Sequence, residues 1–268
     1  MKRQCLIAGL PDSGKSTYIA ALSYLLEHPV DNQQWILGNK AFDKTVLNKL
    51  SQPWMKVEEV DRTTQGIINS LDFDIIQSTK PNEHLLLNLP DMAGETFASL
   101  IMGTTEGFDT MEDSPDCLLY FIRKMPRHVL IEDLTSTDEE KAEPNTQKIE
   151  FTIQSISPDI QNILLLKELV KMYGISKLCI ILSCWDEREN EEKPKETLKA
   201  NNPFLYNYIN YRFPNSPIYG LSAQGAEYLH QPEQTVMLLN KTREGTRCFV
   251  KLDDNISHDI TLPLTHLL

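Results

Sequence analysis

A stretch near the start of the chain has the residue types and spacing that bind nucleotide phosphates. Residues 9–16 read Gly-Leu-Pro-Asp-Ser-Gly-Lys-Ser and fit the pattern Gly-x-x-x-x-Gly-Lys-[Ser/Thr], after an apolar run and before a helical pattern. The glycines let the backbone wrap closely around phosphates, while backbone N–H groups and the helix N-terminus supply positive potential. We expect Lys15 to reach the β and γ phosphates and Ser16 to offer its hydroxyl to Mg²⁺. The predicted phosphate-binding residues are Gly9, Asp12, Ser13, Gly14, Lys15, Ser16 and Thr17.

With this loop the chain resembles the translation-factor-like and Ras-like (TRAFAC) class of P-loop GTPases, over about residues 2–226. Asp91 and Gly94 follow the apolar run HLLLNLP and match the Asp-x-x-Gly motif of that class. The resemblance implies that Asp91 holds Mg²⁺ through water and that the N–H of Gly94 meets the γ phosphate. An ordinary turn after a strand is the alternative, but the position downstream of the phosphate loop favours the functional interpretation.

The first switch of that class carries a Thr-x-Gly element, and residues 62–67 read Arg-Thr-Thr-Gln-Gly-Ile. The resemblance implies that Thr64 closes over Mg²⁺ and the γ phosphate, with Thr63 as the alternative. Arg62 is similar to the arginine that G-protein α subunits use in cis to neutralise developing charge. A polar lead-in to a strand, with a solvated arginine, is the other interpretation of this stretch.

Base recognition in the class uses Asn-Lys-x-Asp or Thr-Lys-x-Asp, and residues 183–186 read Ser-Cys-Trp-Asp. The resemblance implies that Asp186 accepts the two N–H groups of guanine, which adenine does not offer. Cys184 replaces the lysine whose stem packs over the base, so we expect either a weaker affinity or packing by Trp185. The later tripeptide Ser222, Ala223 and Gln224 resembles the Ser-Ala-[Lys/Gln] loop, in which the alanine N–H meets guanine O6.

Hydrolysis requires an oriented water, and the class places a glutamine for this directly after Asp-x-x-Gly. Glu95 occupies that position here. A carboxylate near a triphosphate is repelled unless Mg²⁺, Lys15 or a proton offsets its charge, so we expect a slow turnover that depends on a partner. A solvated Glu95 at a helix start is an equally good interpretation. The apolar residues that follow form either a partner surface or core: Phe97, Leu100, Ile101 and Met102.

Apolar runs of strand length alternate with helical patterns, which predicts βαβ units and a three-layer α/β domain with a mostly parallel six-stranded sheet. Most of these runs are nearly continuous in apolar residues, as strands covered on both faces are, whereas residues 67–76 alternate and suit an edge. Gly174 is well placed to end the second helix. The expected strands are residues 4–10, 66–77, 84–90, 116–122, 177–183 and 217–222, and the expected helices are 15–27, 158–173 and 195–211.

Two stretches exceed ordinary loop length and are interpreted as functional excursions or family-specific insertions: residues 29–63, with a helix near 40–50, and 125–157, with an acidic polar run that is either solvated or a docking loop. We divide the chain into a GTPase-type domain, residues 1–230, and a C-terminal extension, residues 231–268. In the extension, the runs 234–240 and 247–252 predict a β-hairpin that extends the sheet, and the apolar end ITLPLTHLL is expected to dock on the domain.

Composition limits the possible partners. The 268 residues carry 38 acidic and 26 basic side chains, a net charge of -12, which repels nucleic acid. The sequence shows neither an apolar run of membrane-spanning length nor a signal peptide, so we expect no direct membrane insertion and a cytoplasmic location. Cys5, Cys117 and Cys179 fall in strand-like apolar runs, where cysteine acts as a small hydrophobe and suits a reducing compartment.

The resemblance therefore implies a GTP-hydrolysing switch that uses GTP, GDP and Mg²⁺ and controls a protein effector or is stimulated by an activating partner. A subunit that holds GTP for assembly and turns it over slowly or not at all is the second hypothesis, which Glu95 and Cys184 favour. A P-loop ATPase is the third. The long insertions and trailing hairpin are also similar to bacterial GTPases that occur as pairs in conflict-related gene systems, which suggests another GTPase as partner.

Overall fold

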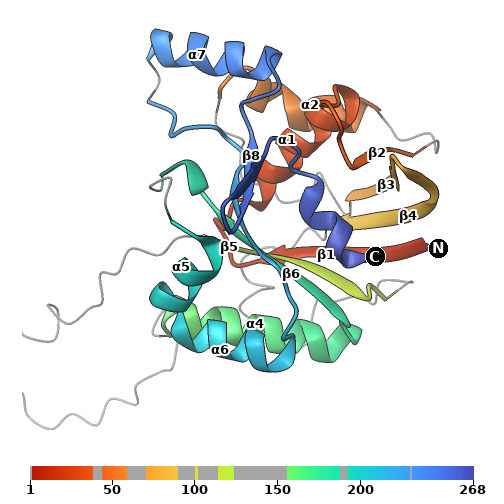
Figure 1. The fold of residues 1–268 in the computed structure, drawn as a ribbon, viewed down its shortest axis with the longest axis vertical. Coiled ribbons are helices and arrows are strands. Elements are labelled where there is room, and N and C mark those ends of the chain that lie inside the picture. The colour runs from red at the N-terminus through yellow and green to blue at the C-terminus, as the bar shows by residue number, and fades with distance from the viewer. Residues whose placement is uncertain are drawn as a thin grey trace, which may run out of the picture.

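The computed structural model describes residues 2–38, 44–58, 71–89, 100–101, 114–123, 156–187, 192–229 and 231–268. Within these residues the chain forms one nine-stranded sheet, in the order β2-β3-β4-β1-β5-β6-β7-β8-β9 (Figure 1). The five central strands, β4, β1, β5, β6 and β7, are parallel, and antiparallel strands continue the sheet on both sides. The strands are β1 (Lys2–Gly9), β2 (Trp35–Leu37), β3 (Leu71–Gln77), β4 (Lys80–Leu89), β5 (Cys117–Arg123), β6 (Lys177–Ser183), β7 (Ile218–Ser222), β8 (Phe249–Leu252) and β9 (Asn255–Ser257).

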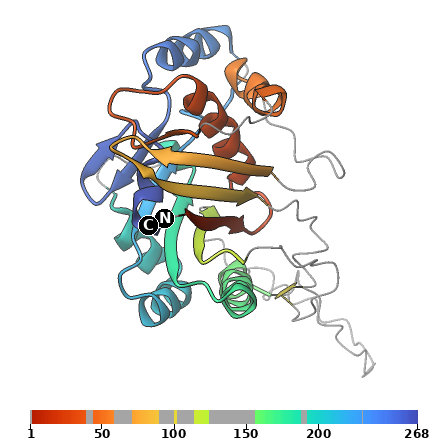
Figure 2. The same cartoon turned by 90° about the vertical axis from the view of Figure 1, so that its right-hand side faces the viewer.

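Helices cover both faces of this sheet and make three layers (Figures 1 and 2). The helices are α1 (Lys15–Glu27), α2 (Lys44–Met55), α4 (Pro158–Tyr173), α5 (Pro194–Asn201), α6 (Pro203–Arg212) and α7 (Pro232–Arg243). One buried cluster joins α1 and Trp54 of α2 to one face, and a second joins α4, α5 and α6 to the other. Side chains of successive strand residues lie on opposite faces of the sheet, since Leu6 belongs to the second cluster and Ile7 to the first. The predicted three-layer α/β fold is confirmed.

Several expected boundaries agree with the structure. The helices α1 and α4 cover the expected residues, and α4 ends at Gly174, whose φ of 65° is the left-handed conformation that glycine adopts readily. The strand β6 also has its expected limits. Cys5, Cys117 and Cys179 are buried in β1, β5 and β6.

Other expectations were wrong. The single helix expected over residues 195–211 is two helices, because Asn202 precedes Pro203 and the residue before a proline avoids helical geometry. The helix of the first insertion, α2 (Lys44–Met55), extends beyond its expected end at residue 50, while residues 40–43 of the expected range lie outside the described residues. The strand count of six was too low, and β3 is not an edge, because β2 pairs antiparallel with its outer side.

The expected hairpin over residues 234–240 and 247–252 was also wrong in its first half. Residues 234–240 lie in α7, which Pro232 at the N-terminal turn, Glu233 in that turn and Lys241 in the last turn all favour. A hairpin does extend the sheet, but it is formed by β8 and β9, with Asp253 at φ 52° in the turn. Its first strand pairs antiparallel with β7.

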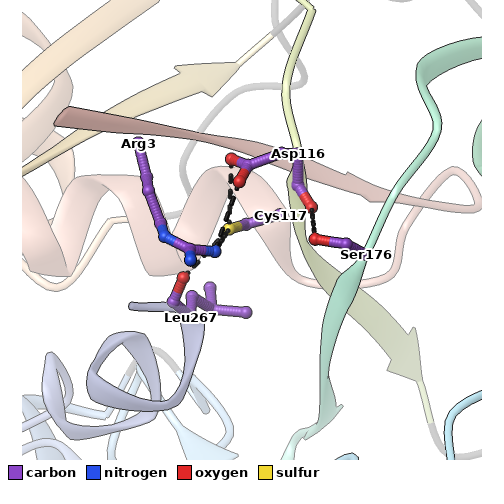
Figure 3. Close-up of polar contacts among 5 residues, drawn as sticks. All are labelled: Arg3, Asp116, Cys117, Ser176 and Leu267. Atoms are coloured by element: carbon purple, nitrogen blue, oxygen red, sulfur yellow. Dashed lines mark hydrogen bonds and ion pairs between the residues drawn. The ribbon is translucent and has the colours of Figure 1, made fainter. Parts of the chain in front are cut away.

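The end of the chain docks as expected. Residues 262–267 form the short helix η3 (Leu262–Leu267), with Leu264 and Leu267 fully buried on the same face as α1. Cys117 at the start of β5 donates its thiol hydrogen to the carbonyl of Leu267 at 2.9 Å, and Arg3 of β1 lies 3.2 Å from Asp116 (Figure 3). The tail is therefore part of the core.

No helix within the described ranges is long and apolar enough to cross a bilayer.

Candidate nucleotide site

The phosphate loop joins the carboxyl end of β1 to the N-terminus of α1. Its shape depends on glycine, because Gly9 and Gly14 have φ angles of 153° and 87°. A Cβ on Gly9 would lie 2.3 Å from the carbonyl oxygen of Phe121, and one on Gly14 would lie 3.0 Å from the Cβ of Ser183. Gly14 is also the N-cap of α1, so no N-cap side chain occupies the start of this helix. The N–H groups of the first turn thus face a concave loop, as anion binding requires.

Lys15 lies across the inside of this loop. Its Nζ donates hydrogen bonds to the carbonyl oxygens of Gly9 at 2.9 Å and Leu10 at 2.8 Å, and to Ser13 Oγ at 3.1 Å. Burial lowers the pKa of Lys15 to about 8, and the charge of Asp12 opposes this shift. A phosphate beside the ammonium would restore the favourable environment for its charge, so loop and lysine fit a polyphosphate.

A cavity of about 250 Å³ opens beside the loop, at the carboxyl ends of the parallel strands. Gly14 and Thr17 of the phosphate-loop motif line it, and so do Asp186, Ala223 and Gln224 from the two later motifs. The structure thus brings three separate sequence motifs to one cavity, at the edge where α/β sheets bind ligands.

The residues around Asp186 are divided between this cavity and the core. Cys184 lines the cavity, is partly exposed and has a φ of 54°. Trp185 is only 3% exposed and packs in the core with α4 and α5. Trp185 does not line the cavity, because its ring is buried against Gly220, so of the two alternatives for the missing lysine the structure does not favour packing of Trp185 over the base. Asp186 is partly exposed and lines the cavity.

The loop after β7 is held by hydrogen bonds from several elements. Ser222 is fully buried, and its Oγ accepts a bond from the N–H of Gly225 at 3.1 Å. The carbonyl of Ala223 accepts from Trp54 Nε1 at 2.8 Å. Ser222 therefore supports the loop from below, while Ala223 lies at the cavity wall.

Three polar cavity residues lie outside the motifs that the sequence indicated. Arg123 ends β5 and is exposed, and Glu227 and Tyr228 follow the Ser-Ala-Gln tripeptide. Arg123 could have been predicted from the sequence, since it ends a buried parallel strand and so lies at the ligand-binding edge of the sheet. Glu227 and Tyr228 carry no such signal, because their place depends on the path of the loop.

Several predicted site residues lie outside the residues that the structure describes: Arg62, Thr63, Thr64, Asp91, Gly94 and Glu95. Ser16, at the start of α1, is partly exposed. In the described part of the chain, no group of three His, Cys, Asp or Glu is arranged to hold a metal ion. Leu100 and Ile101 are 1% and 6% exposed and belong to the core, while Phe97 and Met102 also fall outside the described ranges.

A sheet with a glycine-rich loop at its central strand, and a cavity shared by that loop and two later strand ends, defines a P-loop nucleotide-binding protein. The family comparison gives the particular kind. The sequence profile of the Double-GTPase 1 family matches residues 6–267, and the chain belongs to that family. It is a P-loop GTPase of the double-GTPase type, as the sequence resemblance predicted, and guanine nucleotides are the ligands of that class.

Two solved structures are similar to this chain at low sequence identity. The G domain of the T. maritima FeoB iron transporter is 12% identical, with a TM-score of 0.32, over 90% of this chain and 99% of that one. Sup35 complexed with GMPPNP is 14% identical, with a TM-score of 0.39, over 96% of this chain and 45% of that one. Comparison with curated proteins gives no match.

Proposed function

We propose that this protein binds GTP with Mg²⁺, hydrolyses it to GDP, and changes its contact with a protein partner according to the nucleotide bound. The observation that carries the proposal is the shared cavity, which Gly14 of the phosphate loop lines together with Asp186 and Ala223. A nucleotide must bridge its phosphates and its base, and this cavity connects the residues suited to each.

Guanine fits the chemistry of Asp186 and Ala223, which both line the cavity. Asp186 is a two-oxygen acceptor, which complements the N1–H and the exocyclic amine of guanine. The N–H of Ala223 is a suitable donor for guanine O6. Adenine carries an amine at that position and lacks the N1 hydrogen, so its binding would leave buried polar groups unpaired, which disfavours it strongly.

Hydrolysis is proposed to use residues from three segments. Ser16 would hold Mg²⁺ together with Thr64 and Asp91, and the ion would neutralise charge on the β and γ phosphates when bound. Lys15 would bind the same phosphates. Glu95 takes the place of the water-orienting glutamine, and Arg62 would neutralise charge that develops in the transition state.

A slow or non-hydrolysing GTP-binding subunit is the second candidate. It is favoured by Cys184, which places a small thiol at the cavity wall where the class has a lysine stem, and by Glu95. For both candidates, we propose a second GTPase as the partner class.

The test measures binding of fluorescent GDP and GTP to the whole chain, followed by single-turnover phosphate release with Mg²⁺. Asp186→Asn is expected to lose its preference for guanine and to favour xanthine, whose C2 carbonyl accepts from an amide. Lys15→Ala should lower the affinity for every nucleotide, while Asp31→Asn, at an exposed position, serves as the matched control. Stronger competition by ATP than by GTP, or unchanged selectivity in Asp186→Asn, contradicts the base assignment. Binding without phosphate release favours the assembly subunit.

A further inference from the structure

A buried arginine contacts the loop of residues 223–228, which follows β7 and is called the base loop below. Arg247, which precedes β8, is only 2% exposed. Its Nε donates to the carbonyl of Gln224 at 3.0 Å, and its Nη1 donates to the carbonyl of Trp54 at 2.8 Å and to Thr242 Oγ1 at 3.2 Å. Its Nη2 donates to the hydroxyl of Tyr228. One side chain thus joins the base loop to α2 and α7.

The second member of this arrangement is Trp54, which is 1% exposed. The guanidinium carbon of Arg247 lies 3.8 Å from the centroid of the Trp54 ring, a stacked cation–π contact. The indole N–H donates to the carbonyl of Ala223 at 2.8 Å. Two successive carbonyls of the base loop, those of Ala223 and Gln224, are therefore held from behind by these two side chains.

The backbone of the loop is shaped for this contact. Gly225 has a φ of 89°, and a Cβ at this position would lie 2.7 Å from the carbonyl oxygen of Arg247 and 2.9 Å from its Cγ. Glycine permits both the left-handed conformation and the close approach. The loop and Arg247 therefore pack together without room for another residue at position 225.

A buried guanidinium is costly unless its donors are satisfied, and lysine does not reproduce its planar fork. Here the donors reach carbonyl and hydroxyl oxygens in three segments at once. Such a cluster leaves the loop little freedom to move, so Ala223 keeps a fixed position at the cavity wall.

We propose that Arg247 and Trp54 are positioning residues for guanine recognition, which hold the backbone of residues 223–228 in the shape that the base requires. The inference rests on the proposed guanine site and adds α2 to its supporting structure. Neither side chain has to touch the nucleotide, because both act through the carbonyls of Ala223 and Gln224. Their effect should be confined to the base and leave the phosphate end unchanged.

Trp54→Phe tests this directly, since it keeps an aromatic ring under Arg247 and removes the N–H that Ala223 accepts. We expect its affinity for GDP to fall about fivefold or more, the size of one lost hydrogen bond of about 1 kcal/mol. Its affinity for tripolyphosphate, which has no base, should stay within about twofold. Trp35→Phe is the matched control, because Trp35 is equally buried in the same cluster and its Nε1 has no hydrogen-bond partner among the described residues.

Arg247→Lys is the second variant, and it should show the same selective loss of GDP affinity with an unchanged response to tripolyphosphate. Circular dichroism and thermal unfolding establish whether each variant is folded. If Trp54→Phe is not folded, Arg247→Lys alone tests the inference. Equal losses for GDP and tripolyphosphate, or no loss in either variant, overturn the inference. If the wild-type chain binds tripolyphosphate but no guanine nucleotide, the proposed function itself fails, which is a different result.

Discussion

Trp185 packs against Gly220 so closely that a Cβ on the glycine would lie 2.2 Å from the indole ring. These residues belong to neighbouring segments, because Trp185 follows β6 and Gly220 lies in β7, where it pairs with Leu182. The ring is therefore fixed in the core, while the residues on either side of it, Cys184 and Asp186, line the cavity. Because the Trp185 ring is buried, it holds the adjacent Asp186, whose carboxylate is proposed to select the base, at the cavity.

Gly220→Ala should destabilise the protein and weaken guanine binding together. The added methyl group cannot fit beside a rigid, buried indole, and overpacking of this kind costs about 1–3 kcal/mol. Urea unfolding would measure the loss, and fluorescent GDP binding would report the displacement of Asp186. Gly174→Asn is the control, because a Cβ there meets no atom within 4 Å and asparagine tolerates the left-handed conformation. A Gly220→Ala variant as stable as this control would contradict the contact.

Nucleotide affinity should fall as the pH rises above about 8. Burial lowers the pKa of Lys15 to about 8 in the free protein, and bound phosphates favour its charged form. Binding therefore takes up a proton once free Lys15 is neutral, so the affinity should decrease with pH, by up to about tenfold per unit. Below about pH 7.5, Lys15 is already charged and this dependence disappears.

Titrations of GDP between about pH 7 and 8.8, below the range in which guanine loses its N1 proton, would test this effect. If Lys15→Arg still binds GDP, its affinity should not decrease with pH in this way, because arginine stays charged throughout this range. A wild-type affinity that is constant up to about pH 8.8 would show that the free loop keeps Lys15 protonated.

Leu264→Ala should unfold the domain more easily by about 2–5 kcal/mol, the usual cost of a leucine removed from a packed core. Leu264 is fully buried against the face that α1 also covers, so its loss leaves a cavity in the main core. Ile256→Ala in β9 is the comparison, because Ile256 is 54% exposed and its truncation should change stability by about 0.5 kcal/mol or less. Equal unfolding midpoints for the two variants would mean that the tail is a dispensable appendage.

Much of the site could be predicted because its signals are local. The phosphate loop is a continuous stretch whose glycines, lysine and serine act on neighbouring backbone groups, and buried parallel strands appear as continuous apolar runs. The spacing of Asp186 and Ala223 after such runs was enough to assign them to one edge of a sheet. The fold class, the limits of α1 and α4 and the family resemblance followed from these patterns.

The tertiary structure decided everything that depends on contacts between distant segments. Short apolar patterns do not distinguish a strand from one face of a helix, so the placement of residues 234–240 in α7 required the packed structure. Trp185 points inward because Gly220 leaves room for it, and no pattern around Trp185 encodes that space. Trp54 and Arg247 reach the base loop across 169 and 23 positions, and Arg247 bonds the carbonyl of Trp54 across 193. Composition and periodicity carry no information about pairings at such separations, since only the packing of the whole chain brings those atoms together.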